Sequence, residues 1–143
     1  MVTLMDKKAS FTAELASLHP ILNWVGSHLE KTSFSDVEVR RIELALEEGI
    51  VNIISYAYQG TVGMIDVSFH SEEGKYVELT FEDSGEPFNP LTHKKERDPF
   101  VPIEEMEIGG LGIHFMKELM DKVEYKREGD KNTLRLQKKL PKD

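Results

Sequence analysis

The chain has 143 residues, of which 39% are hydrophobic and 31% are charged, as expected for one soluble globular domain. Its formal net charge of −8 argues against nucleic-acid binding, which needs clustered Lys and Arg. There is no cysteine, so disulfides and thiolate metal sites are excluded. No apolar run approaches the length of a signal peptide or the ~20 residues of a membrane span. We therefore expect a cytoplasmic protein that contacts neither nucleic acid nor membrane.

The first half of the chain predicts one strand followed by two helices. Apolar and polar residues alternate over residues 10–15, which is the period of a half-buried strand. An apolar stripe at helical spacing then begins after Ser17, a plausible helix cap. Ser35 and Glu38 have the spacing of a capping box, which predicts a second helix running to about Tyr58.

The second half predicts four more strands and one more helix. An irregular stretch with several prolines interrupts them, and such a long connection is typical of a functional lid or a disordered segment. The order β-α-α-β-β-lid-α-β-β predicts an α+β two-layer sandwich, with helices on one face of a mixed, mostly antiparallel sheet. The predicted strands are residues 64–69, 76–83, 122–128 and 132–140, and the helix follows Gly112.

The second helix carries a polar pair beside its apolar face. Glu48 and Asn52 are four residues apart, so they stand one above the other on the helix. Gly49 lies between them, where a glycine costs about 0.5–1 kcal/mol relative to Ala. The amide oxygen could hold a hydrated Mg²⁺ while the carboxylate faces a nucleophile. The alternative is a solvated helix face without chemistry.

Two further segments have the chemistry of a nucleotide site. Asp83 ends an alternating strand, and a carboxylate there can accept a hydrogen bond from an exocyclic amine while the ligand packs against the turn through Gly85 and Phe88. A plain Asp-x-Gly turn is the alternative. Residues 109–112 place three glycines where a helix begins, and unpaired N–H groups and the helix dipole there favour a phosphate chain. A hinge or a tight packing contact is the alternative.

Together and in this order, the motifs ExxxN, DxGxP and GGLG resemble the GHKL ATPase superfamily and its Bergerat nucleotide-binding fold. The resemblance covers nearly the whole chain. The segments ELALEEGIVNIISYAY, FEDSGEPFNP and GGLGIHFMKELMDKVEYKREGDKNTLRLQKKL look most like the small anti-sigma-factor serine kinases of bacterial partner-switching systems. The resemblance implies one histidine kinase-like ATPase domain over residues 1–143, with an ATP lid at about residues 91–108.

The resemblance also implies a role for each candidate residue. Glu48 would be the general base or polarising group, and Asn52 would coordinate the Mg²⁺ that bridges the nucleotide phosphates. Asp83 would contact the adenine amino group, and Thr133 would support that contact through water. The other nucleotide-binding positions that it implies are Gly85, Phe88, Gly110, Leu111 and Gly112.

The activity implied is that of an Mg·ATP-dependent serine/threonine kinase. Its substrate would be a STAS-type anti-sigma-factor antagonist, its other partner a sigma factor that it sequesters, and its oligomeric state a homodimer. Tyr56, four residues after Asn52, stands where relatives often carry His. A second hypothesis is therefore a non-catalytic nucleotide-binding module that acts by protein–protein competition. A third is a purely structural α+β domain.

Overall fold

A computed structural model of the protein describes residues 4–57, 63–92 and 111–141. The predicted order of strands and helices is confirmed, with two short helical turns added: η1 is a 3₁₀ turn and η2 a π-helical turn. The elements are β1 (Leu4–Thr12), η1 (Leu15–Ser17), α1 (Leu18–Leu29), α2 (Asp36–Asn52), η2 (Ile53–Ala57), β2 (Met64–Glu72), β3 (Tyr76–Asp83), α3 (Leu111–Leu119), β4 (Lys122–Glu128) and β5 (Lys131–Lys139).

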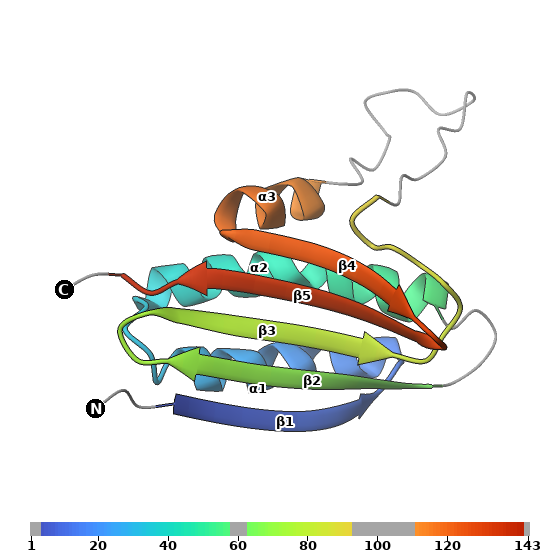
Figure 1. The fold of residues 1–143 in the computed structure, drawn as a ribbon, viewed down its shortest axis with the longest axis horizontal. Coiled ribbons are helices and arrows are strands. Elements are labelled where there is room, and N and C mark those ends of the chain that lie inside the picture. Colours follow the sequence, from blue (N-terminus) through green and yellow to red (C-terminus); the bar gives the residue numbers. More distant parts are fainter. Residues whose placement is uncertain (1–3, 58–62, 93–110, 142–143) are drawn as a thin grey trace.

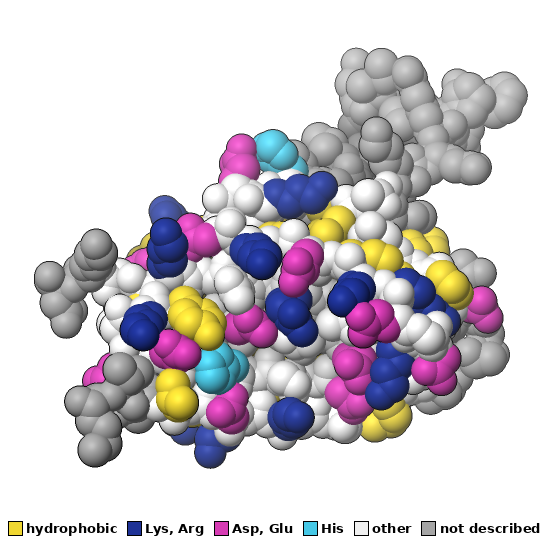
Figure 2. All heavy atoms as spheres, viewed as in Figure 1, with side chains coloured by type: hydrophobic (Ala, Val, Ile, Leu, Met, Phe, Trp, Pro, Cys, Tyr) yellow, Lys and Arg dark blue, Asp and Glu magenta, His cyan; other side chains and the backbone are white. Residues whose placement is uncertain are grey.

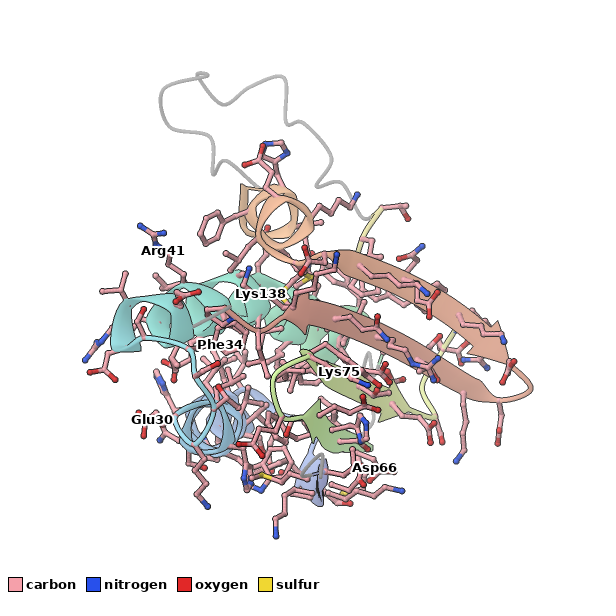
Figure 3. The ribbon with its side chains drawn as sticks, turned by 60° about the vertical axis from the view of Figure 1, so that its left-hand side comes forward. Glu30, Phe34, Arg41, Asp66, Lys75 and Lys138 are labelled. Atoms are coloured by element: carbon pink, nitrogen blue, oxygen red, sulfur yellow. The ribbon has the colours of Figure 1, made fainter. Side chains whose placement is uncertain are left out.

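The strands form one sheet in the order β1-β2-β3-β5-β4, with the helices on one face of it (Figures 1 and 3). This is the predicted α+β two-layer sandwich. The expectation of a mixed sheet needs correction, because each of the four pairings between described strands is antiparallel. The chain crosses through α3 between β3 and β4, yet β5 and not β4 pairs with β3, and it runs against β3.

The core lies between the sheet and the helices. In β2, β3 and β5, alternate side chains are buried, as in a sheet with one solvated face. The buried apolar stripe of α2 packs over them and includes Ile42, Leu46 and Ile50. Within the described ranges, no helix has the length and apolar character needed to span a bilayer.

Several predicted boundaries are confirmed, and others shift. The Ser35 capping box is present, with the Ser35 hydroxyl accepting from the Glu38 N–H. Ser17 precedes α1, but its hydroxyl bonds the Thr12 hydroxyl instead of a helix N–H. The first strand begins at Leu4, earlier than predicted, because pairing with β2 supports the polar residues that lack a strong strand pattern. The predicted lid over residues 91–108 lies outside the described residues from position 93 onward.

The solvated face of the sheet carries charges of both signs. Figure 2 shows acidic and basic side chains intermingled across the strands. Among them, Lys131 pairs with Glu82 at 3.0 Å and Arg135 with Glu78 at 3.4 Å. Exposed pairs of this kind each contribute about 0–1 kcal/mol. Two of the predicted site residues lie elsewhere, Asp83 at the end of β3 and Asn52 at the end of α2.

On the inner side, the imidazole of His28 sits between two aromatic rings. Its ring centroid is 4.5 Å from that of Trp24 and 5.4 Å from that of Phe69. Its Nδ1 is buried and has no hydrogen-bond partner within the described part of the chain. Burial lowers the pKa of His28 below its usual 6.5, and the charges of Lys31 and Lys7 lower it further.

This burial predicts a pH-dependent stability. Because the folded-state pKa lies below the unfolded one, the unfolded chain binds more protons at low pH, so stability is lost as pH falls below 6.5. We expect His28→Phe to reduce the drop in unfolding free energy between about pH 8 and about pH 5.5, measured by urea denaturation. His19→Gln, an exposed histidine in the same helix, is the control. An unchanged drop in His28→Phe would contradict the assignment.

Candidate functional site

The end of β3 holds a buried carboxylate. Asp83 is 4% exposed, and the strand register places Asn132 of β5 directly opposite. The Asn132 Nδ2 amide and the Gly85 backbone N–H both donate to the Asp83 Oδ1 oxygen, each at 2.9 Å. The hydrogen bonds found for Asp83 among the described residues thus fall on one oxygen, Oδ1.

Asn132 was not among the predicted site residues, yet its side chain bonds several segments around Asp83. Its Nδ2 also donates to the Glu86 carbonyl at 2.8 Å, and its Oδ1 accepts from the Phe88 N–H at 3.3 Å and from the Tyr125 hydroxyl. One 3% exposed amide therefore ties together β3, the turn that follows it and β4. Residue type alone could not reveal this, because the contacts to Asp83 and Glu86 join segments 49 and 46 residues apart.

Asn132, and not the predicted Thr133, lies beside Asp83. Thr133 pairs with Glu82 and Lys126, one residue out of step with Asp83. Successive side chains of a strand point to opposite faces, so Thr133 belongs to the outer face of the sheet and Asp83 to the inner one. The prediction that Thr133 lies near Asp83 was wrong by one residue, because sequence spacing does not specify the register between two strands.

The pKa of the buried Asp83 carboxyl is raised above its usual value. Burial raises this pKa, while the Asn132 amide, the Gly85 N–H and the Arg127 guanidinium act in the opposite direction. The amide and the N–H stabilise the charged form by hydrogen bonding. A shift of this kind, in a carboxylate held on one oxygen, is characteristic of a functional position.

The turn after β3 packs closely against the end of η2. A Cβ on Gly85 would lie 2.5 Å from the Ala57 carbonyl oxygen, so only glycine fits. The Glu86 N–H donates to that same oxygen at 2.9 Å, and the Arg127 guanidinium donates to the Gly85 carbonyl at 2.7 Å. The close approach at Gly85 is thus made by the chain itself, and it joins the Asp83 turn to the helix that carries Glu48.

Two aromatic rings reinforce this junction. The rings of Tyr56 in η2 and Phe88 in the turn stack with their centroids 5.3 Å apart and their planes 26° from parallel. Stacked aromatic pairs of this kind contribute about 0.5–1.5 kcal/mol beyond their burial. Phe88, a predicted site residue, therefore lies beside Tyr56 at the same end of the site as Asp83.

At the other end of the site, Glu48 meets the first turn of α3. Its Oε2 oxygen accepts a hydrogen bond from the Ile113 N–H at 3.1 Å. A Cβ on Gly112 would lie 2.4 Å from that oxygen, so a larger residue there would displace the carboxylate. The amino end of α3 thus attracts an anionic group, as helix N-termini do. Gly110 and the side chain of Leu111 lie outside the described residues.

Asn52 lies between these two ends and is 6% exposed. It is one turn beyond Glu48, which is a rise of about 6 Å along an α-helix. The helix changes to π-helical geometry immediately afterwards, at Ile53–Ala57. Such π-helical turns occur frequently at functional sites. Glu48 and Asn52 thus lie one turn apart in α2, and Asp83 precedes the turn whose Gly85 packs against the end of η2.

These residues form no metal cage of their own. No group of three or more His, Asp or Glu side chains in the described ranges could bind a metal ion. Mg²⁺ bound to substrate phosphates needs only one or two protein oxygens, since it keeps several waters. The buried Asn52 amide fits that requirement.

The sheet with helices on one face (Figure 1) has the architecture that the resemblance to the GHKL superfamily implies. The sequence profile of the histidine kinase-like ATPase domain matches residues 11–138. The chain belongs to this family, and the predicted superfamily is confirmed.

Several curated relatives are serine-protein kinases named RsbW. The protein from Listeria innocua serovar 6a is 35% identical over 104 residues, which are 69% of this chain and 66% of the relative. The protein from Halalkalibacterium halodurans is 33% identical over 101 residues, or 67% and 59% of the two chains. The protein from Bacillus licheniformis is 29% identical over 98 residues, or 65% and 60%. The chain thus spans between 59% and 66% of the length of these relatives.

The role of Asn132 can be tested by comparison with its neighbour. Asn132→Ala removes one of two donors from the buried Asp83 carboxylate, so we expect a loss of about 1–3 kcal/mol in unfolding free energy at neutral pH. We expect Thr133→Val, on the outer face, to change it by no more than about 0.5 kcal/mol. Urea denaturation measures both. Equal effects of the two substitutions would mean that the register argument is wrong.

Proposed function

We propose that this protein is an Mg·ATP-dependent serine/threonine kinase. Its substrate is a STAS-type anti-sigma-factor antagonist, and it sequesters a sigma factor when that antagonist does not compete for it. Relatives named as serine-protein kinases support the catalytic part of this proposal. The partners, a homodimeric state and a cytoplasmic location are carried over from the family resemblance.

The observation that carries the proposal is the placing of two carboxylates beside different parts of the α2–η2 helix. Asp83 is bound to the end of η2 through the Gly85 and Glu86 contacts with Ala57. Glu48 lies more than two turns earlier, at the amino end of α3. An extended nucleotide needs this separation, since adenine must bind at one end and the transferred phosphate must reach a base at the other.

Each end has a defined chemical task. The Asp83 Oδ2 oxygen accepts a hydrogen bond from the adenine amino group, while Oδ1 stays held by Asn132 and Gly85. The Glu48 carboxylate would orient an incoming serine or threonine hydroxyl and take its proton as the hydroxyl oxygen bonds to the γ-phosphorus and the bond from that phosphorus to the ADP oxygen breaks. Phosphoryl transfer depends mostly on positioning and charge neutralisation, so a single base is sufficient.

Mg²⁺ would be held by the Asn52 amide oxygen together with the nucleotide phosphates and water. When bound, it would neutralise charge on the transferred phosphoryl group. Gly110, Leu111 and Gly112 would cradle the phosphates with backbone N–H groups, and residues 91–108 would close over them as a lid. Thr133 retains no role at the adenine contact in this proposal.

The alternative, a non-catalytic nucleotide-binding module, depends on Tyr56. Its ring stacks on Phe88 at the adenine end of the helix, so it supports the turn that holds the base. This leaves Glu48 as the residue that separates the two hypotheses. A module without catalysis would bind ATP and still compete for partners after Glu48 is replaced.

Glu48→Gln is the direct test of catalysis. A glutamine keeps an oxygen that can accept from the Ile113 N–H, so the fold and ATP binding should persist, whereas the base is lost. We expect phosphate transfer from labelled ATP to a panel of purified antagonist domains from the same genome to fall by about 10²–10⁴-fold. Transfer by the variant at the wild-type rate would show that Glu48 is not the base. No transfer by the wild-type protein would favour the alternative.

Asp83→Asn tests the adenine contact. The two donors on Oδ1 require an acceptor, so the new amide must turn its NH₂ group toward the ligand, where it meets the adenine amine as donor against donor. We expect calorimetry to show ATP binding weakened by about 10–100-fold. Inosine triphosphate, which presents an acceptor at this position, should lose much less affinity. A parallel loss for both nucleotides would contradict this geometry.

A further inference from the structure

An exposed apolar stripe runs along α2 toward Glu48. Val37 is 58% exposed and Leu44 is 62% exposed, and neither packs into the core. Together with Arg41 and Glu48 they recur at intervals of four, three and four residues, which places all four on one face of the helix. The exposed part of this face of α2 therefore carries two apolar side chains and one cation, Arg41.

α3 extends this surface. Gly112 lies against Glu48, and Phe115, one turn later in α3, is 36% exposed. α2 and α3 run in opposite directions beside one another (Figure 1). Moving forward along α3 from Gly112 is therefore moving backward along α2 from Glu48, so Phe115 lies on the Leu44 side of the carboxylate.

Arg41 gives the surface a charge preference. Its side chain projects from α2 into solvent, away from the sheet (Figure 3). It forms no salt bridge with any described residue, although the chain has 26 acidic and 18 basic residues. An exposed Arg between apolar side chains is typical of an interface that meets a carboxylate.

We propose that Val37, Arg41, Leu44 and Phe115 form the docking surface for the protein substrate, a folded domain that presents apolar side chains beside a carboxylate. This inference rests on the proposed function. A substrate hydroxyl must reach Glu48, and Leu44 is one helical turn from it, so a domain that delivers the hydroxyl covers this surface. Kinase–substrate encounters are transient, and a small apolar patch with one charge suits them.

A second copy of this chain fits the surface less well. A two-fold contact centred here would bring Arg41 against its own copy, because such interfaces are isologous. Like charges brought together across an interface disfavour the contact. The substrate carboxylate, in contrast, would complement Arg41 and steer the encounter.

The test uses the antagonist domain that the wild-type protein phosphorylates best. In the triple variant Val37→Ser/Leu44→Ser/Phe115→Ser we expect KM for that domain to rise about tenfold or more, with the calorimetric affinity for ATP unchanged. The control is Leu4→Ser/Leu15→Ser, which removes two apolar side chains that are 58% and 63% exposed in β1 and η1. This control should leave KM unchanged.

The charge is tested separately. Arg41→Glu should raise KM more than Arg41→Ala does, because it replaces attraction by repulsion. The KM of the wild-type protein should rise with salt, whereas that of Arg41→Ala should respond less, since screening acts on the lost pair. If KM responds to salt identically in the two proteins, the proposal that the partner presents a carboxylate to Arg41 is wrong.

The outcomes separate this inference from the proposed function. If the wild-type protein phosphorylates no antagonist domain, the proposed function fails and the docking surface fails with it. If transfer occurs but the triple variant keeps the wild-type KM, only the docking surface is overturned. The triple variant could also keep the wild-type KM but lose a dimer in sedimentation, or lose sigma-factor binding. Either result would overturn the substrate-docking proposal and assign the surface to a second copy of the chain or to the sigma factor.

Discussion

The site depends on the hydrogen bonds that hold the Asp83 carboxyl group, which is buried at the end of β3. Burial alone raises the pKa of this group, and an unpaired buried charge would be too costly to retain. The Asn132 amide and the Gly85 N–H offset that cost, and both act on one oxygen. Their second effect is geometric, because both donors lie on Oδ1. In the proposed function, Oδ2 is the oxygen that accepts from the adenine amino group.

Close contacts within the chain also define the other end of the site, at Glu48. Gly112 admits the Glu48 carboxylate to the amino end of α3, where the helix dipole and the Ile113 N–H stabilise it. Gly85 admits the Ala57 carbonyl in the same way. Both glycines thus allow two segments of this chain to meet, and the α2–η2 helix connects the two meeting points. Its exposed outer face, which begins at Val37, leads from solvent to Glu48.

Local patterns in the sequence determined most of the fold. The Ser35 capping box, the alternation in β2 and β3 and the hairpin of β4 and β5 depend on neighbouring residues, and each was predicted and is found. The order of elements was sufficient to predict a two-layer sandwich, because strands and amphipathic helices must bury one face each. Glu48, Asn52 and Asp83 were predicted as site residues because their motifs resemble those of a known superfamily, and their roles stay predictions.

Only the tertiary structure decided the register and the contacts between distant segments. Asn132 and not Thr133 faces Asp83, because a shift of one residue between two strands exchanges the faces of the sheet. The bond from Ile113 to Glu48 and the stacking of Tyr56 on Phe88 join segments far apart in the chain, and no local pattern specifies them. The sequence determined which groups are present and on which element, whereas packing decided which of them meet, because that choice depends on how the whole sheet aligns.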